Sequence, residues 1–595
     1  MNSRVNPRNR AVKVAIVGGG FGGLCMAIKL REAGIEDFVV LEKAGELGGT
    51  WRENTYPGCA CDVQSHLYSY SFEGNPDWSA RYSGWREIQD YILATAAKHG
   101  IHERTRFHAE VTGAHYDEAR ARWTLDLTDG DQVECQHWVL ASGPLHVPQI
   151  PNFPGLERFQ GKVFHSSQWD HDYDLSGKKV VSVGTGASAI QYVPQIAPRV
   201  ERLTVVQRTP GWIIPRDERR YSALSKRLFR RFPALRKLHR ARLYWSNESR
   251  VLPIFHPRLA TLLEKGVKQF IRLQVKDKDT ARRLTPSYTL GCKRIMISNR
   301  YYPTFNRDNV ELVTEGVKEV REHSIVFSDG TERDMDCLVL GTGFVVDPRI
   351  YMQGFPIVGR GGRTLQEDWK DASEAYLGIT VAGYPNLFQM VGPNTGLGHN
   401  SIVFMIECQA RYIVDAIEKA DAKGVDALDV KRSEMDAFNE KLQKDVAGTV
   451  WQQGGCSSWY QQADGKNVAI WPYSTWRYWL KTRQVDESKY HWEKVARPVT
   501  STAATPTNKL ALRIAFPSST NDFVPNIRPR PLIKLILLAL NARAFGAKMK
   551  YPLTARCVKI ATMASGMPST TPIVTSISKK AAILANAIWL KSALD

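Results

Sequence analysis

Apolar residues along the chain group into two similar stretches, each reading as strand, glycine turn, helix and strand. The first covers residues 12–42, where the apolar run VKVAIV precedes GGGFGG, a helical pattern follows, and FVVLE closes the stretch. The second covers residues 178–209, KKVVSVGTGASAIQYVPQIAPRVERLTVVQRT, with a β-branched run before its glycines. Strands that alternate with helices in this way predict two α/β units built on parallel sheets.

The first glycine turn carries a complete dinucleotide-binding pattern. Gly18, Gly20 and Gly23 form GxGxxG between the strand and the helix, and Glu42 ends the second strand. In this pattern the first glycine permits the turn, the second lets the backbone approach a pyrophosphate, and the third packs helix on strand. An acid about twenty residues further on can accept hydrogen bonds from ribose hydroxyls. We therefore expect a Rossmann-like dinucleotide unit, and the pairing of this acid-ended site with the arginine-ended site described next is the arrangement of an FAD protein reduced by NADPH.

The second turn predicts a site for a different dinucleotide. Gly184 and Gly186 begin a GxGxxA variant, and Ser188 within it is a further candidate for cofactor binding. Its second strand ends without an acid, and Arg208 and Thr209 follow instead. A cation and a hydroxyl suit the 2′-phosphate of NADP(H), which a carboxylate would repel. The alternative is that Arg208 only caps a surface strand.

Two short repeats suggest how the two units are connected. Residues 139–144, VLASGP, and 339–344, VLGTGF, each end an apolar strand in small residues and glycine. We interpret both as crossovers between an FAD domain and an inserted NADP domain. The expected domains are 10–148 and 370–495 for the two parts of the FAD domain, and 149–369 for the NADP domain. Residues 216–285 have apolar positions at spacings of three and four and are expected to form a helical insertion in it.

Composition and charge add one unusual feature, a basic C-terminal extension over residues 496–595. The chain of 595 residues has a formal net charge of +20, and residues 501–595 hold 13 lysines and arginines against two aspartates. Such a tail is compatible with a solvated extension, an interfacial helix or weak contact with a membrane surface. No apolar run reaches 18 residues, no signal-peptide pattern is present, and the nine cysteines include no CxxC, so we expect reduced thiols and a cytoplasmic protein.

Two longer patterns resemble the fingerprints of a known family. The segment FQGKVFHSSQWD at 159–170 fits FxGxxxHxxxW[P/D], and residues 49–62 fit GxWxxxx[FY]PGxxxD. Both are similar to the Baeyer-Villiger monooxygenases, which are flavin-dependent, and the similarity continues through residues 288–313, 392–401 and 455–472. It covers roughly residues 10 to 495. Relatives that oxygenate nitrogen or sulfur usually end the first fingerprint differently, so the match favours ketone oxygenation.

The resemblance implies an activity and assigns residues to it. The implied enzyme uses NADPH, O₂ and FAD to insert one oxygen atom next to a ketone carbonyl through a peroxide of the flavin, giving an ester or lactone. Arg294 matches the family's active-site arginine, which holds the negative charge, and Asp62 matches the carboxylate that orients it. Thr50, Trp51 and Asp62 are assigned to the FAD, Lys293 to the NADP phosphate, and Trp459 to a mobile loop. The alternative without a binding role is that Lys293 is a solvated neighbour of Arg294 and that Trp459 is a residue of the hydrophobic core.

The sequence leaves alternatives to this function. An N- or S-oxygenating flavin monooxygenase is the main alternative, with a sulfide as a possible substrate. Electron transfer to a cysteine pair is disfavoured because the chain offers only Cys59 and Cys61, in a CxC spacing. His165, inside the first fingerprint, is expected to position the link between domains rather than to catalyse. No metal site and no nucleic-acid partner are expected, although a third hypothesis makes the tail a membrane- or nucleic-acid-binding segment.

Overall fold

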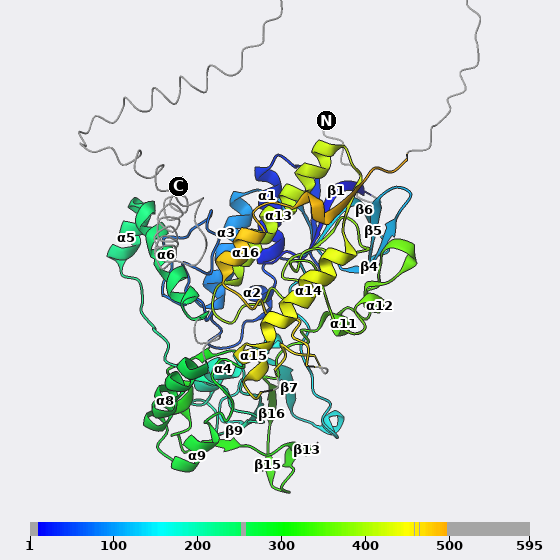
Figure 1. Cartoon of the computed structure of the whole chain (residues 1–595). Coiled ribbons are helices and arrows are strands. Elements are labelled where there is room, and N and C mark those ends of the chain that lie inside the picture. The colour runs from blue at the N-terminus through cyan, green and yellow to red at the C-terminus, as the bar shows by residue number, and fades with distance from the viewer. Residues whose placement is uncertain (1–9, 252–256, 457, 463–464, 497–595) are drawn as a thin grey trace, which may run out of the picture. The chain divides into compact units, whose positions relative to one another are not determined.

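The computed structural model describes residues 10–251, 257–456, 458–462 and 465–496 (Figure 1). The predictions for the basic tail, 496–595, therefore lie outside the described residues, apart from residue 496 itself. Within the described part, no helix is both long enough and apolar enough to cross a membrane.

The first sheet has eight strands, and most of them come from the first 140 residues. Its order is β17-β4-β5-β6-β1-β2-β3, with β18 paired to β6. The strands are β1 (Arg10–Val17), β2 (Phe38–Leu41), β3 (Thr105–Arg106), β4 (Val111–Asp117), β5 (Arg122–Leu127), β6 (Gln132–Leu140), β17 (Ile357–Val358) and β18 (Leu387–Gln389). Strands β1, β2, β3 and β6 run parallel, as the strand and helix pattern predicted, whereas β4 and β5 form an antiparallel extension.

Helices cover this sheet because its central strands are apolar on both faces. In β1, Val12, Val14, Ala15 and Ile16 are all buried, which is typical of a parallel strand packed on two sides. Helix α1 (Phe21–Glu32) is buried along most of its length and packs on α13 (Ile402–Lys423). Helix α13 ends at Gly424 in the left-handed conformation, which glycine adopts without steric cost. Residues 402–423 therefore complete the unit that residues 10–140 begin.

The second sheet is wholly parallel. Its order is β12-β9-β8-β16-β7, formed by β12 (Val310–Val313), β9 (Arg202–Val206), β8 (Lys179–Val183), β16 (Cys337–Leu340) and β7 (Lys162–His165). Helix α4 (Ala189–Ile196) follows β8 directly, as the second glycine pattern predicted. A sheet with a parallel core and a second, wholly parallel sheet, each with a glycine turn after its first strand of the pattern, confirm the α/β fold class with two Rossmann-like units.

The two expected crossovers lie next to each other. The Gln149 amide donates to the Gly343 carbonyl at 2.9 Å, and Pro148 pairs with Phe344 in an isolated bridge. The chain leaves the second sheet after β16 and rejoins the first at β17, ahead of the boundary expected at 369. The domain limits stay predictions. The pairing of β17 with β4 bears on the limit expected at residue 369, because the chain has already returned to the first sheet at residue 357.

The stretch expected to be a helical insertion contains four described helices. They are α5 (Ala223–Arg231), α6 (Pro233–Glu248), α8 (Pro257–Gln274) and α9 (Lys278–Arg283), between β10 (Ile213–Ile214) and β11 (Met296–Ile297). Helices α5 and α6 pack on each other, and α8 contacts α10 (Tyr301–Thr304) beside the second sheet. The insertion therefore divides into the α5–α6 hairpin and the α8–α9 pair.

The remaining elements complete the two units. Near the first sheet lie α2 (Thr50–Glu53), α3 (Trp85–Lys98), α11 (Pro348–Tyr351), α12 (Leu365–Asp368), α14 (Arg432–Ala447), α16 (Thr475–Lys481), β19 (Ala427–Val430) and β20 (Tyr490–Glu493). Helix α15 (Val450–Gln453) packs with residues of the second unit, such as Trp212 and Cys292. A small antiparallel sheet of β13 (Val317–Val320), β14 (Ser324–Phe327) and β15 (Glu332–Asp334) precedes β16.

Candidate functional site

The first glycine turn joins β1 to α1 and leaves space beside its middle glycine. Gly18 has a φ of +107°, and a Cβ there would lie 2.5 Å from the Ala141 carbonyl oxygen. A Cβ on Gly23 would lie 1.8 Å from the Gly18 oxygen, so α1 packs directly on the turn. At Gly20 the nearest atom would be 3.6 Å away. The turn thus forms a cradle into which a pyrophosphate fits before the N-terminus of α1.

Glu42 ends β2 beside this cradle. It is buried, and its Oε2 accepts a hydrogen bond from the Gly19 amide at 2.7 Å. Its Oε1 accepts from Arg52 Nη1 at 2.9 Å, so the charge of the carboxylate is paired. Thr50 and Trp51, on the short helix α2, line the same space. These residues line one space, and their binding to FAD stays a prediction.

The second glycine turn repeats the geometry of the first. Gly184 has a φ of +106°, and a Cβ there would lie 2.3 Å from the Gly341 carbonyl oxygen. At Gly186 a Cβ would meet nothing within 4 Å, so the space in front of this residue is open. Ser188 stands immediately before α4. In both units the first glycine therefore packs against the crossover segment, and the second glycine faces a space that a phosphate can fill.

Cations gather on one side of the second turn. Arg208 and Thr209 follow β9, and Lys293 comes from the segment before β11. Burial lowers the pKa of the Lys293 ammonium, and the neighbouring Arg208 guanidinium lowers it further. Two positive charges close enough to disturb each other favour an anion between them. The binding of Arg208, Thr209 and Lys293 to the NADP phosphate stays a prediction, which their common position at the cavity wall supports.

Arg294 and Asp62 form an ion pair between the two units. Arg294 Nη2 lies 2.7 Å from Oδ1 and 2.6 Å from Oδ2 of Asp62, although 232 residues separate them in the sequence. Asp62 raises the pKa of Arg294 further above its usual value, and burial acts in the opposite direction. The Arg294 side chain keeps 43% of its surface accessible. The guanidinium is therefore held on one side and free to meet a ligand on the other.

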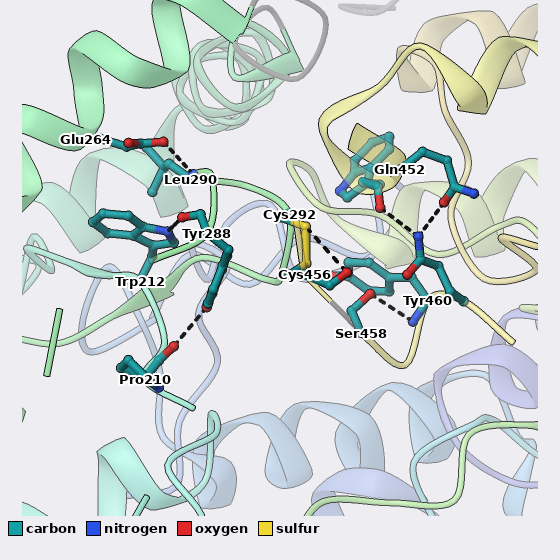
Figure 2. Close-up of a disulfide and its surroundings, with 12 residues drawn as sticks. Pro210, Trp212, Glu264, Tyr288, Leu290, Cys292, Gln452, Cys456, Ser458 and Tyr460 are labelled. Carbon is teal, nitrogen blue, oxygen red and sulfur yellow. Dashed lines mark hydrogen bonds between the residues drawn. A yellow bond between two sulfur atoms is a disulfide. The ribbon is translucent and has the colours of Figure 1, made fainter. Parts of the chain in front are cut away.

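A disulfide joins the Arg294 segment to a second segment of the cavity wall. Cys292 and Cys456 are bonded, with their Cα atoms 6.2 Å apart (Figure 2). The Thr289 amide also donates to the Gly454 carbonyl at 2.9 Å. The expectation that the cysteines are all reduced thiols is wrong for this pair. Folding brings together two residues that lie 164 positions apart, and no local spacing indicates this contact.

Trp459 and Tyr460 follow the disulfide and also line the cavity. Trp459 is 50% exposed, whereas Tyr460 is buried, and their ring centroids are 4.6 Å apart. Burial raises the pKa of Tyr460 to about 12, and the Arg294 charge opposes this shift. Trp459 is thus no core residue, which excludes the packing interpretation; its assignment to a mobile loop stays a prediction.

The histidine of the first fingerprint is not among the residues that line the cavity with the ion pair. His165 ends β7, where its Nδ1 lies 2.8 Å from Ser167 Oγ and its ring packs on Phe344 of the second crossover. Burial lowers the pKa of His165. Trp169, four residues later, packs on Phe164 and on Tyr192 of α4. These contacts fit the prediction of a positioning role at the link between the units.

The remaining cysteines are unsuited to redox exchange. All six described free cysteines are buried. Burial raises the pKa of Cys59 to about 12 and raises that of Cys61 as well, so neither forms a thiolate readily. In the ranges that the structure describes, no group of three or more histidine, cysteine and acidic residues is arranged to hold a metal ion.

One cavity of about 1550 Å³ connects these features. Among its lining residues are all but one of the predicted site residues: Gly18, Gly20, Glu42, Thr50, Trp51, Asp62, Gly184, Gly186, Ser188, Arg208, Thr209, Lys293, Arg294 and Trp459. Gly23, the exception, packs α1 on the turn instead. A cavity that reaches both glycine turns and the ion pair has room for two dinucleotides that meet at Arg294.

Sequence reasoning missed several residues of this cavity. Arg52 pairs with Glu42, the Tyr68 hydroxyl accepts from the Trp51 indole at 3.2 Å, and Tyr460 adjoins Trp459. Gln191 of α4 bridges the two units, because its Oε1 accepts from the Tyr56 hydroxyl at 3.0 Å. The only signal for these residues was their position beside a motif, as with Tyr460 in SSWY.

Comparisons with known proteins agree with this geometry. The family model described as flavin-binding monooxygenase-like matches residues 11–355. A protein named Baeyer-Villiger monooxygenase from Pseudomonas aeruginosa is 46% identical over 484 residues, which cover 81% of this chain and 92% of that protein. A steroid monooxygenase structure bound to NADP has a TM-score of 0.74 at 30% identity, and an OTEMO complex with FAD and NADP has 0.74 at 25%. Each alignment covers 82% of this chain and 100% of the solved one.

Fold and cavity together define a protein with two dinucleotide sites that meet at one arginine. The chain belongs to the flavin-binding monooxygenase family, and its similarity to curated relatives assigns it to the Baeyer-Villiger monooxygenases within that family. The predicted family and the predicted enzyme class, a flavin-dependent monooxygenase, are thereby confirmed.

Proposed function

We propose that this protein uses NADPH, O₂ and FAD to insert one oxygen atom next to a ketone carbonyl, releasing an ester or a lactone. The observation that carries the proposal is the Arg294–Asp62 pair, which lies in one cavity with both glycine turns. The relative named Baeyer-Villiger monooxygenase supports a ketone as the substrate class.

The residues present fit both cofactors. The cradle at Gly20 and the buried carboxylate of Glu42 would hold the pyrophosphate and ribose of FAD. The open space at Gly186 would hold the pyrophosphate of NADPH. Arg208 and Lys293 would bind its 2′-phosphate, since that group supplies the anion that their mutual repulsion favours. When bound and reduced by NADPH, the flavin supplies the electrons that activate O₂.

Arg294 supplies the fixed positive charge of the reaction. Oxygen insertion develops negative charge on oxygen atoms, first before the ketone is attacked and then on the former carbonyl oxygen. The Arg294 guanidinium cannot lose its proton at any working pH, so it can stabilise both charges without taking part in proton transfer. Asp62 holds the guanidinium in one orientation, and it keeps the cation paired in the cavity wall.

Product analysis tests this function. The full-length protein is incubated with FAD, NADPH and O₂ together with a panel of ketones, sulfides and amines. Esters or lactones formed in proportion to the NADPH consumed support the proposal. Sulfoxides or N-oxides formed without any ester would overturn it in favour of the N- or S-oxygenating alternative. We also propose the cytoplasm as the compartment, which fractionation of the producing cells tests.

A further inference from the structure

The α5–α6 hairpin exposes a row of large apolar side chains. Its outer residues Leu224, Leu228, Phe232, Leu235 and Leu238 have exposed fractions between 38% and 65%. Periodic apolar residues on a helix usually face the core of the protein. Here they are exposed to solvent, on a hairpin that lies at one edge of the first-sheet side of the structure in Figure 1. Several large apolar side chains exposed on one helical hairpin indicate a surface that binds something.

The same hairpin is strongly basic. Between residues 219 and 247 the sequence contains 10 lysines and arginines and no aspartate or glutamate. Arg227 and Arg231 are exposed, and each stands three positions after an exposed leucine, Leu224 or Leu228. Residues three apart lie on one side of a helix, so cations flank the apolar row of α5. Arg242 follows Leu238 by four positions and extends this arrangement along α6.

The inner side of the hairpin is fixed to the protein and does not depend on the outer row. The Arg240 guanidinium donates to the carbonyls of His66 and Ser69 at 2.7 and 2.8 Å. Tyr221 and Phe229 pack on the His66 ring, with centroids 4.9 Å away in each case. The outer leucines are therefore presented by a rigid support, and replacing them removes little of the packing that holds the hairpin.

We propose that the outer face of the α5–α6 hairpin docks the protein on an anionic phospholipid membrane. An apolar row between cations is the composition of a helix that lies in the interface, with its leucines among the acyl chains and its arginines at the phosphates. The basic tail, with 13 lysines and arginines against two aspartates after residue 500, has the same sign of charge as this face and offers it no complementary charge. A nucleic acid would use the arginines and leave the leucines in water.

Vesicle sedimentation tests the proposal with the full-length protein. Wild type is mixed with vesicles of phosphatidylcholine alone or of phosphatidylcholine with phosphatidylglycerol, and the bound fraction gives a partition coefficient. We expect binding to the mixed vesicles only. Leu228→Ser with Phe232→Ser lowers the coefficient at least about 10-fold, because two side chains no longer leave water. Arg227→Gln with Arg231→Gln lowers it by roughly 10- to 30-fold at low salt.

Two matched variants control for composition and charge. Leu273→Ser removes an exposed leucine from α8, and Lys441→Gln with Lys444→Gln removes two exposed cations from α14. We expect both to bind vesicles within about twofold of wild type, since a surface charge far from the membrane contributes little. Unchanged FAD content and melting temperature of each variant show that the hairpin variants still fold.

Three outcomes would overturn the proposal. If the wild-type protein does not bind the vesicles that contain phosphatidylglycerol, the membrane is not its partner. If the hairpin variants bind the vesicles as well as wild type does, the membrane binds another surface of the protein, such as the tail. Hairpin variants that lose affinity for a duplex oligonucleotide while they keep their vesicle affinity show that the partner is a nucleic acid. None of these results bears on oxygen insertion, so the two proposals stand or fall separately.

Discussion

Replacing Arg294 with alanine separates reduction of the flavin from insertion of oxygen. The first glycine turn and Glu42 are far from Arg294 in the sequence, and none of the contacts described for them involves this side chain. FAD should therefore remain bound, and NADPH should still reduce it. The step that loses its support is the one in which negative charge develops on oxygen.

The size of the effect follows from the contacts of Arg294. Its guanidinium is oriented by one carboxylate, Asp62, and 43% of the side-chain surface is accessible. Loss of one preorganised donor to a developing oxyanion costs about 3 to 4 kcal/mol, which corresponds to roughly 100- to 1,000-fold in rate. The variant also leaves Asp62 unpaired, so its carboxylate repels negative charge in the cavity. We therefore expect the upper part of this range.

The assay compares three quantities at one ketone concentration: NADPH consumed, ester formed and hydrogen peroxide released. In wild type, ester and NADPH should match. In Arg294→Ala, NADPH consumption should continue while hydrogen peroxide replaces the ester almost completely. Arg300→Ala is a matched control, because Arg300 is an exposed arginine of the same segment, 3.9 Å from Glu218. Ester formation that stays coupled to NADPH in Arg294→Ala would refute the reasoning.

Four further results are expected. Arg208→Ala should raise the KM for NADPH by roughly 10- to 100-fold and leave that for NADH nearly unchanged, since only NADPH carries the 2′-phosphate; equal losses for both would move the phosphate site elsewhere. Asp62→Ala should resemble Arg294→Ala more mildly in its ratio of ester to peroxide, because the cation remains but is less well oriented; complete uncoupling would contradict this. Reducing the disulfide of Cys292, which closes a loop of 164 residues, should lower stability by up to about 5 kcal/mol, visible as a lower Tm in calorimetry with reductant; a Tm indifferent to reductant in wild type argues against the bond. Burial would raise the pKa of Glu248, but hydrogen bonds from its neighbours lower it overall, so Glu248 contributes to the free energy of unfolding above its unfolded pKa and loses this contribution as the pH falls through its folded pKa. Glu248→Gln should therefore lower the Tm at neutral pH but not at pH values below the folded pKa. An equal drop in Tm at all pH values would exclude this linkage.

The sequence predicted the parts of the site that depend on local chain geometry. At Gly18 and Gly184 the pattern of strand, glycine and helix determines the fold of the turn, and both positions have the positive φ that favours glycine. The pairing of Asp62 with Arg294 is different. It joins residues 232 positions apart, so only the family resemblance indicated it, and the structure brings them within 2.7 Å.

What the sequence could not show depends on tertiary packing. The disulfide was missed because Cys292 and Cys456 lie in separate segments that meet only when α15 packs beside the Arg294 segment. The apolar spacing in 219–245 correctly predicted helices, but spacing does not tell which face of a helix is covered. Phe229 packs inwards on His66, whereas Leu228 next to it faces solvent.

The attachment of the α5–α6 hairpin has a mechanical consequence. In the sequence the hairpin belongs to the unit of the second sheet, between β9 and β12, yet the end of α6 is fastened elsewhere. The Glu248 carboxylate accepts from the Thr475 amide at 2.7 Å, and Asn247 exchanges hydrogen bonds with Gln64. Helix α8 instead ends against the second-sheet unit, where Asn306 donates to the Gln274 carbonyl at 2.8 Å. A force applied to the hairpin is therefore carried first by the frame of the first sheet, although the hairpin belongs to the other unit in the sequence.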